Sequence, residues 1–288
     1  MIPSIRQSRF TQFIRSGYLV YFFIFLFLPL SIVAVFSFND APYPFPPWKG
    51  FTWDWFFANG AGERTGLFFD QEILDSLINS GKVALGVTFF SVLVGTGNAF
   101  LLERFRFRGQ QLLSQMMLIP LVIPGVILGI SILSLMSKLA QFADDVFGWE
   151  LDFLRPGLFL VALGQFSYIV AIATLTISAR LKRLDMSLEE AAMNLGANKR
   201  AIFLTITLPY LKPAIWGAVL MSFLLSFENF NTTYMLAGSD APLTVLMYGR
   251  MKEGATPVVN AISLMMMLVS GVIAMALYFG GKKKTSMS

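Results

Sequence analysis

The sequence predicts an all-α polytopic membrane protein with six transmembrane helices. Apolar residues make up 56% of the 288-residue chain and charged residues only 14%, whereas about a quarter of the residues in a soluble domain are charged. The mean hydropathy is +0.66, and 29 residues are Phe. A soluble protein of this length could not bury so much apolar surface, so we expect lipid to surround most of the chain. Six separate stretches reach the roughly 20 apolar residues that cross the hydrocarbon core as a helix.

The six stretches lie along the whole chain and are separated by polar or charged segments. We predict transmembrane helices over residues 17–38, 74–102, 112–137, 156–181, 213–236 and 257–280. Arginines precede the first stretch, as in a signal peptide. However, its apolar run is about 20 residues long without a small-residue cleavage site, so we expect a retained span. Pro120 and Pro124 interrupt the third stretch, which predicts a kink or break there.

Charge differs between alternate connections. The N-terminus, residues 103–109 and 180–212 and the C-terminal tail together hold fifteen Lys or Arg residues and four acids. The segments near 39–82, 138–155 and 237–256 hold seven Lys or Arg residues and twelve acids. Because Lys and Arg accumulate on the cytoplasmic side of membrane proteins, we expect the first group, with both termini, in the cytoplasm. The net charge of +5 has the same explanation, so we expect no nucleic-acid partner.

The longest outside connection, residues 39–73, combines prolines with aromatic residues. It contains Pro42, Pro44, Pro46 and Pro47, followed by Trp48, Trp53 and Trp55. Two interpretations stay open. The first is an interfacial aromatic belt on a proline-stiffened crossing. The second is a docking surface for an extracytoplasmic partner.

The chain contains no Cys and no His. This composition argues against disulfides, the usual zinc sites, thiol nucleophiles and the commonest general base. The run Met265–Met267 is better explained by packing or lipid contact than by metal binding. We therefore expect no catalytic residue and no metal site.

The connection 182–212 differs in kind from the others. Ser187 and Glu190 have the spacing of a capping box, which predicts a helix start. Gly196 predicts the end of that helix, and Asn198 can cap a second one. We expect Pro209 to break the chain before the fifth span. Two short helices meeting at a glycine suit a rigid projection that docks into a partner, but on these features alone an ordinary amphipathic surface loop fits equally well.

This segment resembles the EAA motif of permease subunits in binding-protein-dependent ABC importers. The matching residues, at the motif's spacing, are Glu190, Ala191, Ala192, Gly196, Ile206, Leu208 and Pro209. The resemblance implies a type I ABC importer permease fold, as a single permease domain over residues 1–288. It also implies that this loop is a coupling helix seated in a cleft of a cytoplasmic ATPase.

The ATPase itself is a separate partner in this interpretation. The sequence contains no Gly-x-x-x-x-Gly-Lys-Ser/Thr phosphate loop. We therefore expect that this chain is not an enzyme and binds no cofactor, and that ATP and Mg are held by two ATPase subunits. The other expected partners are a second homologous permease, an extracytoplasmic substrate-binding protein and the bilayer of the bacterial inner membrane.

Further stretches resemble the spermidine/putrescine permease group. They are residues 79–109, 119–129, 225–230, 243–248 and 257–261. The resemblance implies a polyamine substrate. The group commonly carries paired Asp residues where this chain has Glu228 and Asn229, and one charge in place of two leaves other solutes open. These include an amino-acid or sugar-amine conjugate, thiamine and iron.

Glu228 is the only acid that lies deep in a predicted span. A carboxylate there costs a few kcal/mol unless it is paired or faces a wet cavity. We expect it to line the substrate path with Asn229, Asn231 and Thr232; pairing with a cation of the partner permease is the alternative. Proton-coupled or cation-coupled secondary transport through Glu228 is a rival function, although no inverted repeat is visible.

Glycines in two spans are expected to serve helix packing. Gly125 and Gly129 are spaced for close contact in the third span. The same role is expected of four glycines in the second span, namely Gly81, Gly86, Gly95 and Gly97.

Overall fold

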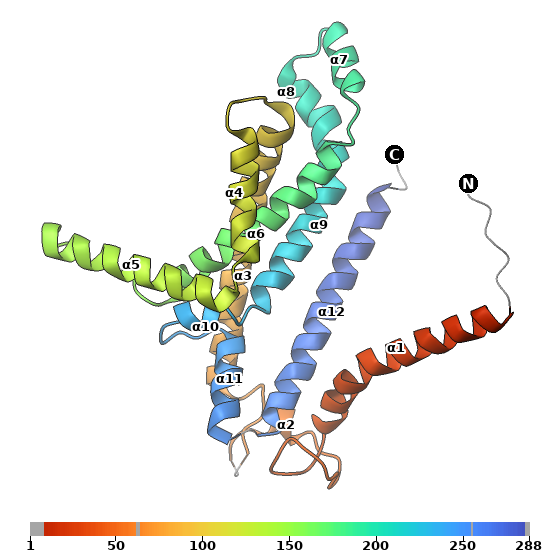
Figure 1. Ribbon diagram of the computed structural model, residues 1–288. Helices are drawn as coiled ribbons and strands as arrows, with labels where there is room; N and C mark the ends of the chain where they lie inside the picture. Colours follow the sequence, from red (N-terminus) through yellow and green to blue (C-terminus); the bar gives the residue numbers. More distant parts are fainter. Residues whose placement is uncertain (1–8, 62–63, 255, 286–288) are drawn as a thin grey trace. The chain divides into compact units, whose positions relative to one another are not determined.

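A computed structural model describes residues 9–61, 64–254 and 256–285 (Figure 1). The described residues are almost entirely helical and contain no β-strand beyond two isolated bridges. Within them, six helices are long and apolar enough to cross a membrane. Their bounds are Gln12–Phe36, Gln71–Arg104, Gly125–Phe147, Leu158–Leu181, Lys199–Phe227 and Val258–Met275. The predicted class and number of spans are therefore confirmed.

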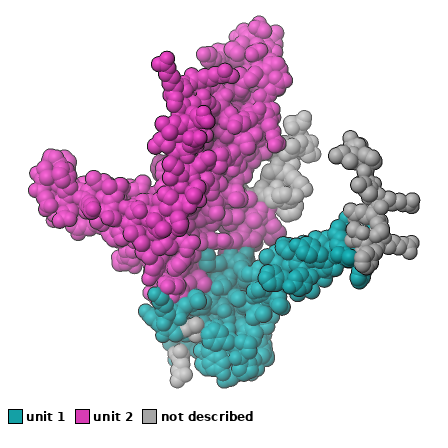
Figure 2. All heavy atoms as spheres, viewed as in Figure 1, with its two compact units in different colours: residues 1–70, 250–268 teal, residues 71–249, 269–288 magenta. Residues whose placement is uncertain are grey.

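The chain divides into two compact units, which are coloured separately in Figure 2. The first comprises residues 1–70 and 250–268, and the second residues 71–249 and 269–288. The division at residues 268 and 269 falls within helix α12 (Val258–Thr285). Each unit is described by itself.

The first unit contains helix α1 (Arg9–Phe36), the short helix α2 (Asp54–Phe57) and the start of α12. Asn39 organises the loop after α1, because its side chain accepts from the Lys49 amide at 2.8 Å and its carbonyl accepts from the Trp55 indole at 2.8 Å. Rings of the predicted aromatic loop stack on one another, with Phe38 and Phe51 5.3 Å apart. This stacking fixes the loop, and the choice between interfacial belt and docking surface stays a prediction.

An ion-pair cluster closes the same loop. The Arg64 guanidinium lies 2.7 Å from Asp40 and 3.1 Å from Asp54, and it also stacks 4.8 Å from the Trp55 ring centroid. The hydrogen bond from Arg64 to Asp40 raises the pKa of the guanidinium further. Arg250 pairs with Asp70 at 2.7 Å. This ion pair joins the two chain segments of the unit, residues 1–70 and 250–268.

Three helices form the core of the second unit: α3 (Gln71–Arg104), α6 (Leu158–Leu181) and α9 (Leu208–Phe227). Their buried residues include Ala99, Ala173, Ile177, Leu211 and Ala218. Small residues let the backbones approach closely. A Cβ on Gly95 would lie only 2.9 Å from the Ala173 Cβ, which confirms its packing role. Among the described residues of this chain, nothing lies within 4 Å of a Cβ built on Gly81, Gly86 or Gly97, so the packing role expected of these three glycines stays a prediction.

The predicted third span, 112–137, is divided into two helices. Helix α4 (Gln110–Val122) ends before Ile123, and α5 (Gly125–Phe147) begins after Pro124 and runs away from α4 (Figure 1). Ile123 has φ −73° and ψ 128°, the extended conformation that a following proline favours. The expected break is therefore confirmed, but the span bounds are wrong. The long apolar helix is α5, which extends into the segment assigned to an outside loop.

The predicted fifth span, 213–236, also has different bounds. A continuous helical segment begins at α8 (Lys199–Ile202), passes through a π-helical turn (Phe203–Thr207) and continues as α9 to Phe227. The predicted break at Pro209 is wrong. Pro209 lies in the first turn of α9, directly after the π turn, and a proline is tolerated in the first turn of a helix. Residues 228–232 are non-helical, before the short helix α10 (Thr233–Leu236).

The segment between the fifth and sixth spans is also helical in part. Helix α11 (Leu243–Gly254) occupies most of the predicted outside connection 237–256. Its start is anchored within the second unit, since the Leu243 amide donates to the Ser80 hydroxyl at 2.8 Å. A 3₁₀ turn (Asp152–Leu154) lies between α5 and α6.

Candidate functional site

The first candidate site is helix α7 (Met186–Asn194), which carries the start of the EAA-like segment. Its N-cap is Asp185, whose Oδ1 accepts a hydrogen bond from the Ser187 amide at 3.0 Å. The predicted capping box starting at Ser187 is therefore wrong by two residues, because the carboxylate of Asp185 reaches the free amide first. The hydrogen bond from the Ser187 amide lowers the pKa of the Asp185 carboxyl.

The end of α7 follows the prediction. Gly196 has φ +88°, in the left-handed region that favours glycine. The Ala197 amide returns to the Ala192 carbonyl at 3.0 Å, so the turn satisfies helix-end carbonyls. Asn198 then caps the next helix through a 2.8 Å bond from the Ala201 amide. The predicted turn at Gly196 between two helices is confirmed, but the second helix is not short, because it continues into α9.

The seven motif residues are distributed between an exposed tip and a half-buried base. Glu190, Ala191 and Gly196 on or beside α7 are exposed, whereas Ala192 is half-buried. In the π turn and the start of α9, Ile206 and Leu208 are half-buried and Pro209 is exposed. The tip also exposes large apolar side chains: Leu195 is 89% exposed. Apolar side chains left uncovered in this way mark an interaction surface.

A polar cluster that the sequence did not predict holds α7 to the second span. The Glu189 carboxylate accepts from the Arg104 guanidinium at 3.1 Å and from the Thr207 hydroxyl at 2.7 Å. Arg104 also contacts the Met186 sulfur. Both charged side chains are 14% exposed. Arg104 lies at the end of α3, so no local pattern could have indicated its partner.

A second contact joins α6 to α9, the helix that follows the EAA-like loop. The Arg180 Nε donates to the Tyr210 carbonyl at 2.6 Å, and its guanidinium lies 4.5 Å from the Tyr210 ring centroid. This contact holds the end of α6 against the start of α9, where the segment 182–212 begins and ends.

The second candidate site is the polar break after α9. Glu228 is the C-cap residue of this helix and is exposed. Its Oε1 accepts a hydrogen bond from the Ser270 hydroxyl of α12 at 2.7 Å. Asn231 is also exposed. Two of the four predicted path residues therefore lie at an accessible surface of the chain.

The other two path residues support the break from inside. Asn229 donates to the Tyr168 hydroxyl at 2.7 Å and accepts from the Thr233 hydroxyl at 2.9 Å. Thr232 is 1% exposed, and a Cβ on Gly125 would lie 3.0 Å from its Oγ1. The close contact expected at Gly125 and Gly129 is thus made with the segment after Glu228, and Thr232 packs between helices.

Buried and aromatic side chains that the sequence did not predict complete this region. Gln165, 1% exposed, donates to Thr233 at 2.8 Å and accepts from Ser226. Beyond the break, the Phe230 and Tyr248 ring centroids lie 4.9 Å apart, and those of Tyr234 and Tyr248 lie 5.2 Å apart. The break therefore combines one exposed carboxylate, amides and three aromatic rings.

The sequence profile of the family described as binding-protein-dependent transport system inner membrane component matches residues 90–281. This chain belongs to that family. It is a permease subunit of an ABC importer and an inner-membrane protein, as the motif resemblance implied.

Two relatives of this permease are named as permease proteins of polyamine transport systems. The putrescine transport system permease protein PotI of Escherichia coli (strain K12) is 31% identical over 259 residues, covering 89% of this chain and 86% of PotI. The spermidine/putrescine transport system permease protein PotC of Haemophilus influenzae is 31% identical over 265 residues, covering 92% and 94%. The resemblance to this permease group is confirmed.

Two solved structures share the fold. A bacterial ABC transporter that imports the polysaccharide alginate matches with a TM-score of 0.72 and 14% identity, covering 98% of this permease and 100% of the matched chain. The MetNI methionine ABC transporter, in an inward-facing form, matches with a TM-score of 0.53 and 15% identity, covering 74% and 94%. The predicted importer permease fold is confirmed.

Proposed function

We propose that this permease imports a polyamine such as putrescine or spermidine, and that Glu228 attracts the cationic substrate. The observation that carries the proposal is the exposed Glu228 carboxylate at the break after α9. The ring cluster of Phe230, Tyr234 and Tyr248 follows it in the chain. A carboxylate and aromatic faces are the groups that attract an alkylammonium ion. The names of PotI and PotC support the same substrate class.

Within this proposal, the path residues have different roles. Glu228 and Asn231 contact the solute, because both are exposed. Asn229 orients the break through Tyr168 and Thr233. Thr232 holds the break against α5 and α6 by packing.

The coupling role is assigned to α7 and the start of α9. Glu190, Ala191, Ala192 and Gly196 form the part that enters a cleft of the ATPase. The exposure of Glu190, Ala191 and Gly196 supports this assignment. Ile206, Leu208 and Pro209 connect it to the fifth span. The Arg104–Glu189 pair fixes the orientation of α7.

The proposed assembly contains this chain as one permease domain, a second homologous permease, two ATPase subunits and an extracytoplasmic binding protein. ATP and Mg are bound by the ATPase subunits, and this chain binds no cofactor. Both termini and α7 face the cytoplasm, as the excess of Lys and Arg on these segments indicates.

The substrate is tested by uptake into proteoliposomes that hold the complete importer and internal ATP. Labelled putrescine, spermidine, thiamine and ferric iron are offered separately with the cognate binding protein. The proposal predicts saturable uptake of a polyamine that unlabelled polyamine competes away. Uptake of thiamine or iron without polyamine uptake would contradict it.

A further inference from the structure

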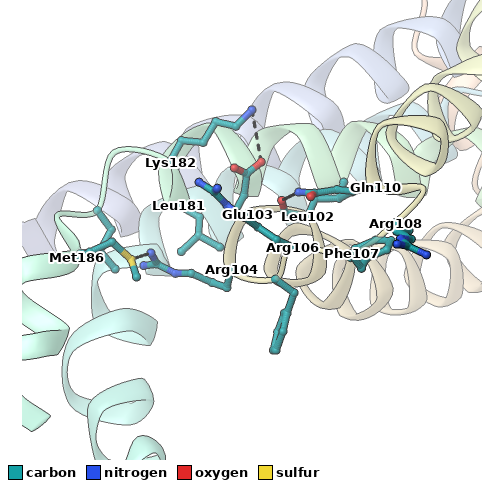
Figure 3. Close-up of a pocket in the computed structure, with 12 residues that line it drawn as sticks. Leu102, Glu103, Arg104, Arg106, Phe107, Arg108, Gln110, Leu181, Lys182 and Met186 are labelled. Atoms are coloured by element: carbon teal, nitrogen blue, oxygen red, sulfur yellow. Dashed lines mark hydrogen bonds and ion pairs between the residues drawn. The ribbon is translucent and has the colours of Figure 1, made fainter.

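A basic cavity lies where α3 and α6 end, beside the start of α4. Its volume is about 840 Å³. Its charged lining consists of Arg104, Arg106, Arg108, Lys182 and one acid, Glu103. Figure 3 shows these side chains around the cavity. The cavity therefore has a strong excess of positive charge.

Two of the four cations are already neutralised by carboxylates. Lys182 lies 3.4 Å from Glu103, and Arg104 lies 3.1 Å from Glu189. The ion pairs found among the described residues include neither Arg106 nor Arg108, and both side chains are exposed. These two guanidinium groups are available to an anion, and guanidinium recognises phosphate by paired hydrogen bonds.

The basic cavity continues into a furrow between α4 and α6. This second cavity has a volume of about 340 Å³ and shares Leu102, Glu103, Gln110 and Lys182 with the first. Away from the charged mouth, its lining includes the apolar Met117, Leu118, Ala171 and Leu175, together with the hydroxyl side chains of Ser114 and Thr174. Because α6 is one of the membrane-spanning helices, this furrow extends from the charged end of the helix toward the hydrocarbon.

We propose that this pair of cavities binds an anionic phospholipid. The phosphate lies against Arg106 and Arg108, and an acyl chain follows the furrow along Met117 and Leu175. Basic pockets between helices at the membrane surface bind such headgroups. Phe105 and Phe107, which are 61% and 38% exposed, alternate with the arginines and can insert at the headgroup boundary.

The combination of charge and furrow distinguishes a lipid from other anions. A soluble phosphate would use the arginines but leave the furrow empty. A ligand with an anionic head and an apolar tail fits both the basic cavity and the apolar side chains of the furrow.

The test measures lipid binding to the purified, complete importer by native mass spectrometry. Dioleoylphosphatidylglycerol and dioleoylphosphatidylcholine are titrated in parallel, with glycerol 3-phosphate as the soluble headgroup. Wild type is expected to retain phosphatidylglycerol in preference to phosphatidylcholine. The double variant Arg106→Gln/Arg108→Gln is expected to bind phosphatidylglycerol about 30-fold more weakly, from the usual contribution of two basic residues.

Two further variants separate the lipid site from general charge. Arg183→Gln removes an exposed arginine that lies next to Lys182 but does not line the cavity, and it should leave lipid retention unchanged. Leu175→Trp fills the furrow without changing charge, and it should weaken phosphatidylglycerol binding. Thermal unfolding midpoints equal to wild type establish that the variants are folded.

Three results would overturn the proposal. They are equal retention of phosphatidylglycerol by wild type and both cavity variants, binding of glycerol 3-phosphate as tight as that of the lipid, and release of an ATPase subunit by the double variant with lipid binding unchanged. The last result would make the cavity a protein interface. The inference rests on the proposed function only for placing this end at the cytoplasmic leaflet. Lipid retention is measured without transport. The lipid-binding result can therefore be interpreted even if the polyamine proposal fails.

Discussion

The guanidinium of Arg104 lies 3.1 Å from the carboxylate of Glu189, which joins the end of α3 to α7, the helix proposed to couple to the ATPase. The same carboxylate accepts from Thr207 at 2.7 Å, in the π turn that leads into α9. Glu189 therefore connects the second span, α7 and the start of the fifth span. A displacement of α7 by the ATPase would act on both spans through this one side chain.

Removing the charge of Glu189 should loosen α7. In Glu189→Gln the guanidinium of Arg104 keeps its charge in a site that is only 14% exposed. We therefore expect the interaction that holds α7 to α3 to weaken by about 1–3 kcal/mol. The measurable result is more ATP hydrolysed per substrate imported in proteoliposomes. The matched control is Asp152→Asn, whose pair with Arg155 is 3.5 Å long and mostly exposed and contributes about 0–1 kcal/mol. An unchanged ratio in Glu189→Gln would contradict the role of this pair.

The turn at Gly196 should tolerate only residues that accept a positive φ. Nothing lies within 4 Å of a Cβ built there, so Gly196→Val acts through backbone strain alone, about 1–2 kcal/mol. We expect ATP hydrolysis to be uncoupled from uptake while membrane insertion stays normal. Gly196→Asn, which adopts the left-handed conformation more readily, should retain more coupling. Equal uptake by the Val variant and wild type would show that the turn is not critical.

Much of this coupling segment could be predicted from sequence, because its signals are local. Gly196 and Asn198 act on amides and carbonyls a few residues away, and both predictions are confirmed. The break predicted at Pro209 is absent, because a π turn over five residues precedes it and the helix continues. Arg104 could not be assigned, since its partner Glu189 is distant in sequence and only the tertiary fold brings them together.

The polar break after α9 also depends on residues that are distant in sequence and could not be paired from the sequence. Glu228 was identified by its charge within an apolar stretch, but the helix end there was not predicted. Gln165 and Tyr168 looked like ordinary polar residues in an apolar span. Their partners, Thr233 and Asn229, follow α9 and become neighbours only when α6 and α9 pack.

Glu228→Gln should weaken uptake of a dication or polycation. Loss of one carboxylate from the path should raise the half-saturating concentration about tenfold, which corresponds to roughly 1.4 kcal/mol. Assembly with the ATPase should be unaffected, as measured by co-purification. Ser270→Ala removes the hydrogen bond to Glu228 without removing the charge, and it should have a smaller effect. Identical kinetics in Glu228→Gln and wild type would reject the path-lining role.

Gln165→Leu should destabilise the helix core. Gln165 is 1% exposed and bonds both Thr233 and Ser226. The leucine leaves the buried Ser226 hydroxyl without its partner and removes one bond of the Thr233 hydroxyl, which we expect to lower the free energy of unfolding by about 1–3 kcal/mol. A lower thermal unfolding midpoint of the purified importer is the expected result. Gln115→Leu, at an exposed position of α4, should not lower it. Equal midpoints for the two variants would contradict the structural role of Gln165.

The cap of α7 should respond to pH. The pKa of Asp185 is lowered by the bond from the Ser187 amide, so the cap stabilises α7 above the ordinary Asp pKa of about 3.9. This stabilisation is lost as pH falls through the lower, folded-state pKa. The Ser187 amide chemical shift should therefore titrate below the usual Asp range, and Asp185→Asn should abolish the titration. A midpoint at or above the ordinary value would contradict the cap.

Coupling of this permease to a separate ATPase is tested most directly by polyamine uptake in proteoliposomes with and without that subunit. The prediction is uptake that requires internal ATP and the ATPase, persists in the presence of ionophores, and falls in Gly196→Val while ATP hydrolysis continues. Uptake driven by an ion gradient in the absence of the ATPase, and abolished by ionophores, would contradict it.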